Sequence, residues 1–124
     1  MRKEIENWIE QAKSDLAAAR NSLKSKNFDW ACFQSQQAAE KALKAVYLKK
    51  FSTLKKVHDL LFLTRELNLP ENLLTSCIKL NRVYIETRYP SPDEEIPSKL
   101  FGNSEAETAI TLAERIIQWA EKQL

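Results

Sequence analysis

The sequence predicts an all-helical fold, an antiparallel up-and-down bundle of four long helices with one additional short helix. Only one glycine, Gly102, occurs among 124 residues. No stretch sustains the alternation of β-branched and polar residues that strands require. Apolar residues instead recur every three or four positions, as on one face of an amphipathic helix. Residues 1–124 are expected to form one domain, because a single core commonly organises about 100 to 150 residues.

The first half of the chain is predicted to form two long helices. The first covers Lys3–Lys24, where apolar residues three or four apart define one face. The sequence KSKN then interrupts the pattern. The second covers Phe28–Lys50, with apolar residues pointing in most directions and many alanines among them. Such a helix is usually central, and alanines let neighbouring helices approach closely.

The second half is predicted to contain a short helix, two long helices and a loop. The short helix covers His58–Leu67. The fourth helix begins at Pro70, a residue that the first turn of a helix tolerates, and it ends where the next prolines begin. Residues 90–103 are expected to form the loop. Ser104 followed by Glu107 matches a capping box, which predicts the start of the last helix.

Composition and charge narrow the class of protein. The 44% of hydrophobic and 29% of charged residues are typical of a soluble globular protein, and no apolar stretch approaches the roughly 20 residues that span a bilayer. The N-terminal sequence MRKEIENWIEQ has no apolar core of a signal peptide, so a cytoplasmic location is expected. A net charge of +2, well mixed along the chain, does not by itself predict nucleic-acid binding.

The sequence offers no recognisable metal or cofactor site. Cys32 and Cys77 lie in apolar helical patterns without CxxC spacing, which predicts buried thiols rather than a redox pair or a zinc site. A protein with one glycine cannot build the glycine-rich loop of a P-loop, and no EF-hand pattern or Ser-His-Asp order is present. No metal and no cofactor are therefore expected.

The sequence QSQQAAEKALK in the second helix places four polar residues on adjoining positions of a largely apolar element: Gln37, Glu40, Lys41 and Lys44. The ordinary interpretation is a solvent-exposed stripe. The alternative is a polar strip facing a groove, in which Glu40 and Lys44 hold each other and a partner group. Burial of this kind needs partners, because an unpaired buried charge costs several kcal/mol.

His58 is the only histidine in the chain and precedes Asp59 at the expected start of the short helix. There Asp59 favours the helix dipole, and His58 is interpreted as a capping or packing residue. A role as general base would require an orienting carboxylate and a substrate within hydrogen-bond reach.

Arg88 lies four residues after Tyr84 on the same helical face, and Tyr89 follows it directly. An arginine near a helix C-terminus ordinarily interacts with the helix dipole. The alternative is that the stiff, proline-rich segment after it holds the guanidinium for bidentate contact with a phosphate or carboxylate. The acidic residues 93–95 are equally available as its internal partner.

Four segments together resemble the HEPN family. They are WIEQAKSDL (Trp8–Leu16), DWACFQSQQAAEKALKA (Asp29–Ala45), HDLL (His58–Leu61) and RYP (Arg88–Pro90), followed by a closing helix. QQAAEKALK is the most specific part and RYP the second. The resemblance implies a five-helix bundle that dimerises through its helices. It also implies a small bacterial or archaeal protein often encoded beside a minimal nucleotidyltransferase, the two acting as a toxin–antitoxin-like pair.

Many HEPN proteins are metal-independent ribonucleases whose signature is an arginine followed four to six residues later by a histidine. No histidine follows Arg88, so only the arginine carries over. The resemblance therefore implies a homodimeric partner of a nucleotidyltransferase that binds a nucleotide or RNA phosphate. Two alternatives stay open, a ribonuclease that uses Arg88 with His58 or Tyr89, and a stand-alone nucleotide-binding domain. The expected binding residues are Gln37, Glu40, Lys41, Lys44, Tyr84, Arg88 and Tyr89.

Overall fold

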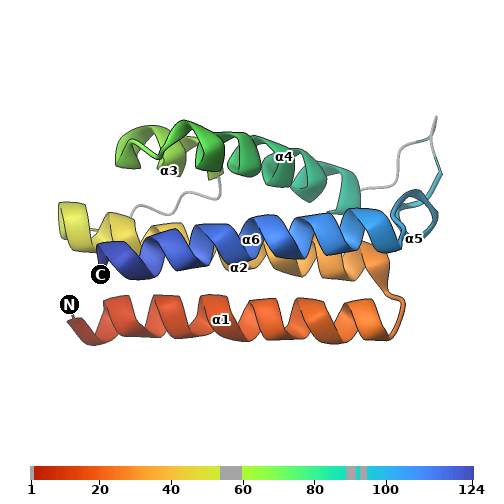
Figure 1. Ribbon diagram of the computed structural model, residues 1–124, viewed down its shortest axis with the longest axis horizontal. Helices are drawn as coiled ribbons and strands as arrows, with labels where there is room; N and C mark the ends of the chain where they lie inside the picture. The colour runs from red at the N-terminus through yellow and green to blue at the C-terminus, as the bar shows by residue number, and fades with distance from the viewer. Residues whose placement is uncertain (1, 54–59, 89–91, 93–94) are drawn as a thin grey trace.

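The computed structural model describes residues 2–53, 60–88, 92 and 95–124, and for residues 84–88 it describes the backbone alone. In this part of the chain the fold is entirely helical, as predicted (Figure 1). The helices are α1 (Arg2–Lys24), α2 (Phe28–Phe51), α3 (Leu60–Leu67), α4 (Glu71–Arg88), α5 (Pro97–Leu100) and α6 (Asn103–Gln123). The long helices α1, α2, α4 and α6 alternate in direction along the bundle (Figure 1).

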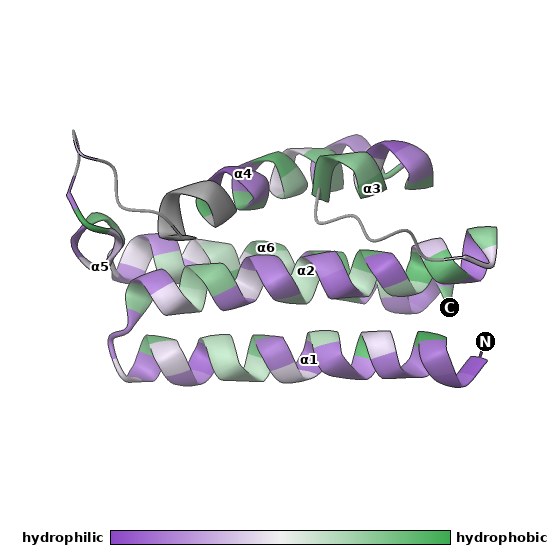
Figure 2. Ribbon diagram, turned by 180° about the vertical axis from the view of Figure 1, so that it is seen from behind, coloured by the Kyte–Doolittle hydropathy of each residue, from purple (hydrophilic) through white to green (hydrophobic). Residues whose placement is uncertain are grey.

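Helix α2 occupies the centre of the bundle. It contacts α1, α3, α4, α5 and α6, and Figure 1 shows α1 on one side of it, α3 and α4 on the other, and α6 lying over it. Its buried residues point in nearly every direction, so the prediction of a central second helix is confirmed. Seen from the side opposite α6, α2 carries hydrophilic bands between its hydrophobic turns (Figure 2).

The core is rich in alanine where α1, α2 and α6 meet. Small side chains let helix axes approach closely, and larger residues then fill the remaining space. Completely enclosed members of this core include Ala12, Ala19, Ala38, Ala39, Ala42, Leu43, Ala106, Ala113, Ile116 and Ala120. Among the described residues no helix combines the length and the apolarity needed to cross a bilayer.

Two sequence predictions for the C-terminal region are wrong. The segment predicted as a loop contains α5, whose first residue Pro97 suits the first turn of a helix. Helix α6 begins at Asn103, with Gly102 as its N-cap and no capping hydrogen bond from a side chain, so the predicted capping box does not form. The Asn103 Nδ2 atom donates instead to Glu107 Oε1 at 2.8 Å, which engages the glutamate that the box would have used.

The turn after α1 places a lysine in the left-handed conformation that glycine usually adopts. Lys26 has a φ of 62°, in the left-handed region. The Asn27 N–H then donates to the Ser22 carbonyl at 2.8 Å and the Lys26 N–H to the Leu23 carbonyl at 3.1 Å. This pattern satisfies the last carbonyls of the helix, and glycine most often supplies its left-handed residue.

Replacement of Lys26 by glycine is expected to raise the free energy of unfolding by about 1 kcal/mol. The left-handed conformation costs a residue with a Cβ about 1–2 kcal/mol, and the greater freedom of glycine in the unfolded chain offsets part of the gain. Urea denaturation measures the change. The matched variant Lys24→Gly, in the last turn of α1, is expected to lose stability instead. Equal stability of the two variants contradicts this account of the turn.

Candidate functional site

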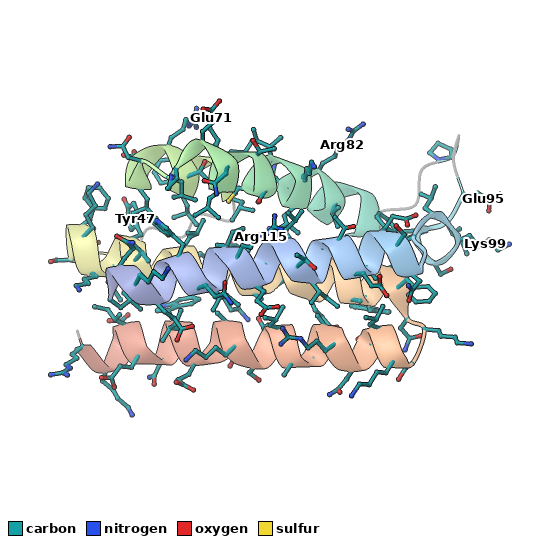
Figure 3. The ribbon with its side chains drawn as sticks, in the orientation of Figure 1. Tyr47, Glu71, Arg82, Glu95, Lys99 and Arg115 are labelled. Carbon is teal, nitrogen blue, oxygen red and sulfur yellow. The ribbon has the colours of Figure 1, made fainter. Side chains whose placement is uncertain are left out.

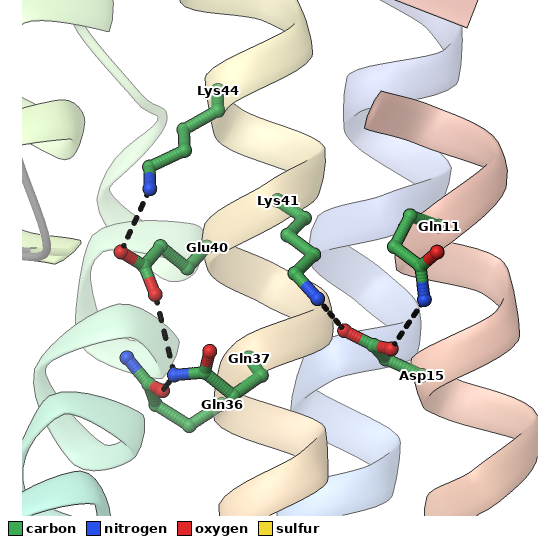
Figure 4. A network of polar contacts seen from close by, with 7 residues as sticks. All are labelled: Gln11, Asp15, Gln36, Gln37, Glu40, Lys41 and Lys44. Atoms are coloured by element: carbon green, nitrogen blue, oxygen red, sulfur yellow. Dashed lines mark hydrogen bonds and ion pairs between the residues drawn. The ribbon is translucent and has the colours of Figure 1, made fainter. Parts of the chain in front are cut away.

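The four polar residues predicted on α2 fall into two clusters (Figure 4). Lys41 belongs to the α1 side, where its Nζ atom lies 2.7 Å from Asp15 Oδ2 and Gln11 Nε2 donates to Asp15 Oδ1 at 2.9 Å. The other three lie on the side of α2 that is turned toward α3 and α4, together with Gln36 (Figure 4). We call Gln36, Gln37, Glu40 and Lys44 the polar strip.

Glu40 and Lys44 form a buried ion pair within the polar strip. Their side chains are only 2% and 8% exposed, and Lys44 Nζ lies 3.3 Å from Glu40 Oε1. The same ammonium lies 5.2 Å from the centroid of the Trp8 ring on α1, a favourable position for a cation over an aromatic face. The interpretation as a solvent-exposed stripe is therefore wrong for this pair, because neighbouring helices cover the central α2.

A chain of amides continues the polar strip from Glu40. Gln37 Nε2 donates to Gln36 Oε1 at 2.7 Å and to Glu40 Oε2 at 3.3 Å. Gln36 is completely buried, and its Nε2 atom has no acceptor among the described residues. A buried donor left without an acceptor costs about 1–3 kcal/mol.

Gln36 was missed by the sequence prediction. The signal was available, because Gln36, Glu40 and Lys44 follow one another at intervals of four residues and so share a helix face. The spacing could not show that the helix face carrying these three residues is buried.

Helix α4 brings its C-terminal end alongside the first half of α2, since the two helices are in contact and run in opposite directions (Figure 1). Arg88 is the last residue of α4. The side chains of Tyr84 and Arg88 lie outside the described residues, as do Tyr89 and His58 altogether. The role of these four residues therefore stays a prediction.

Cys32 and Cys77 are free and buried, as the sequence predicted. Burial in apolar surroundings raises the pKa of both thiols to about 12. The thiolate is the form that reacts with electrophiles and binds metals. Among the described residues no three His, Cys, Asp or Glu side chains are grouped closely enough to hold a metal ion.

Iodoacetamide is expected to leave both thiols of the folded protein almost unmodified at pH 8. With a pKa of about 12, about one thiol in ten thousand is ionised at that pH, and burial also restricts access. Mass spectrometry after a timed incubation measures the extent of modification. The same protein in urea is expected to react at both cysteines. Equally fast modification of the folded protein means that at least one thiol is accessible.

The overall fold and the sequence both have clear relatives. The HEPN domain model matches residues 5–123. The chain belongs to the HEPN domain family. Among solved structures, this HEPN protein is similar to TT1696 from Thermus thermophilus, with 35% identity, a TM-score of 0.90 and 98% of each chain covered. It is also similar to ST0689, an archaeal HEPN homologue, with 34% identity, a TM-score of 0.83 and 97% of each chain covered.

A third similar structure is that of the HEPN domain protein tm0613 from Thermotoga maritima. The identity is 30%, the TM-score is 0.74, and the match covers 94% of this chain and 95% of that one. No curated protein gives a significant match. The family resemblance that the four sequence segments suggested is thus confirmed, together with the helical fold that it implied.

Proposed function

We propose that this HEPN protein is a cytoplasmic homodimer that partners a minimal nucleotidyltransferase in a toxin–antitoxin-like pair and binds a nucleotide or RNA phosphate beside its polar strip. The RYP sequence at residues 88–90, without a following histidine, supports a branch of the family that lacks the ribonuclease pair. The single observation that carries phosphate binding is the burial of the Lys44 ammonium between Glu40 and Trp8.

Burial of this ion pair is poorly explained by stability. Removing two charges from water costs several kcal/mol per ion, and apolar residues of similar volume often stabilise a protein as well or better. Yet Glu40 and Lys44 lie on the central helix, between apolar neighbours that would tolerate apolar residues at these two positions. A binding role accounts for the charges, because Glu40 and Trp8 hold the ammonium in a fixed position before a ligand arrives.

Arg88 is proposed to hold a second phosphate of the nucleotide or RNA, because α4 ends alongside the first half of α2 whereas Lys44 lies in the second half. A guanidinium binds phosphate in a bidentate manner, and an ammonium adds a compact second charge. Tyr84 and Tyr89, which neighbour Arg88 on the helix and in sequence, are proposed to flank the ligand. Lys41 is left out of the proposed site, because it is paired with Asp15 on the α1 side of the bundle.

The proposed dimer draws on aromatic side chains at the surface. Trp30 is 57% exposed and Phe51 40% exposed. Trp30 also packs edge-on against Phe33 with ring centroids 5.9 Å apart. Buried aromatic anchors dominate the energetics of many interfaces. Analytical ultracentrifugation at micromolar concentration tests the dimer, and a monomer at all concentrations refutes it.

Calorimetric titration with ATP and GTP tests the proposed phosphate site. Wild-type protein is expected to bind a nucleotide, and Lys44→Ala and Arg88→Ala are expected to weaken binding at least tenfold. Lys41→Ala is the matched control on the same helix and should bind as wild type does. Circular dichroism verifies that each variant is folded. No heat with the wild type, or unchanged affinity in Arg88→Ala, contradicts the proposed site.

Incubation with structured RNA separates this binding module from a ribonuclease. Cleavage that is present in the wild type and lost in Arg88→Ala would assign an enzyme and overturn the proposal. Equal cleavage by both proteins, or none, removes Arg88 from any catalytic role.

A further inference from the structure

A groove between α4 and α6 shares no residue with the polar strip. It encloses about 470 Å³ and is lined by Lys79, Leu80, Arg82, Val83, Phe101, Ser104, Glu105, Thr108, Ala109 and Leu112. A second hollow of about 380 Å³ continues it and shares Lys79, Thr108 and Leu112. From Ser104 to Arg115 the groove follows α6 for about 17 Å, the length of three helical turns.

The floor of the groove is apolar. Leu80 of α4 is completely buried, and Phe101, Ala109 and Leu112 are also buried. Ile78, which is 52% exposed, lies one turn before Arg82 on the same face of α4 and lines neither hollow. An apolar floor of this size between two helices suits the side chains of a third helix.

The borders of the groove carry cations. Lys79 and Arg82 come from α4, and Arg115 comes from α6. Figure 3 labels the two arginines. In the described part of the chain neither Lys79 nor Arg115 has an ion-pair partner, although Lys13 and Arg20 on α1 are paired with carboxylates of α6. The α6 border also carries the carboxylates of Glu105 and Glu107, so three cations and two anions leave the groove with an excess of one positive charge. The groove therefore offers positive charge to a ligand.

We propose that the α4–α6 groove binds an acidic amphipathic helix of a partner protein. Apolar side chains spaced three or four apart fill the floor, and flanking carboxylates pair with Lys79 and Arg115. Nucleic acid fits the groove less well, because its phosphate backbone needs a continuous row of cations rather than an apolar floor. A second copy of this chain is also a poorer occupant, because the apolar faces of its described long helices are already packed in its own core.

Selection from a displayed library of random peptides of about 15 residues, four helical turns, tests the proposal. The selected peptides are expected to carry apolar residues at helical spacing with flanking Asp or Glu. Lys79→Glu/Arg115→Glu should weaken their binding at least tenfold. Lys3→Glu/Lys122→Glu, with the same change of net charge on exposed positions outside the groove, should bind as wild type does.

The proposal is overturned if no peptide is enriched, if the enriched peptides lack acidic residues, or if the peptides bind both double variants equally well. A single-stranded RNA oligonucleotide serves as the competing probe. If the Lys79→Glu/Arg115→Glu variant binds RNA more weakly but binds the peptides as wild type does, the groove binds nucleic acid and the protein-partner assignment is wrong. Because the polar strip is intact in every variant used, these results are independent of the proposed nucleotide site.

Discussion

Lys44→Met is expected to lower the free energy of unfolding by about 3–5 kcal/mol. Methionine retains much of the length and apolar character of the lysine stem, so packing against Trp8 changes little. What the variant removes is the ammonium beside the Glu40 carboxylate, which is 2% exposed. Removal of the ammonium leaves the Glu40 carboxylate buried without its partner. The free-energy cost of an unpaired buried charge exceeds the net contribution of the ion pair to stability.

Urea denaturation at neutral pH measures the effect against two further variants. Glu40→Leu/Lys44→Met, which removes both charges, is expected to recover most of the lost stability. Lys41→Met, on the neighbouring face, is expected to lose about 1 kcal/mol or less, because its pair with Asp15 is only partly buried. A double variant no more stable than Lys44→Met contradicts the assignment of the loss to an unpaired buried carboxylate.

Leu43→Ala is expected to destabilise the protein by about 2–5 kcal/mol. Leu43 is completely buried on the central helix, within the core that α1, α2 and α6 share. Truncation removes the contacts of the side chain and leaves a cavity, which the surrounding helices close only in part. The effect should be seen as a lower midpoint of urea unfolding, with little change in its slope.

The matched control is Leu100→Ala on α5. Leu100 is 38% exposed, so the same chemical change should cost well under 1 kcal/mol. Similar losses for the two variants contradict the assignment of Leu43 to the core. They also contradict the central position of α2, on which the burial of Glu40 and Lys44 depends.

The helices and the central place of α2 could be predicted because their signals are local. The apolar period of α1 and the apolar character of α2 on all its faces can each be recognised within one continuous segment of the sequence. Helix ends were harder, because backbone geometry decides them. Ser104 and Glu107 have the spacing of a capping box, yet α6 begins at Asn103 and Glu107 is bound to that residue.

The division of the polar residues on α2 could not be predicted from spacing. Lys41 and Lys44 are three residues apart and so lie on adjoining positions of the helix. Their different surroundings are set by residues far away in sequence, Asp15 for Lys41 and Trp8 for Lys44. Lys44 is buried because helices from both halves of the chain close around α2, and no local pattern reports that contact.

The most direct test of the polar strip as a phosphate site is an NMR titration with nucleotide that follows the Trp8 indole N–H signal. Trp8 contacts the Lys44 ammonium, so a phosphate arriving there should move this signal until the site is saturated. The Lys44→Ala variant should abolish the shift, and Trp8→Phe assigns the signal. A Trp8 signal that stays unchanged in a large excess of ATP and of GTP contradicts the account.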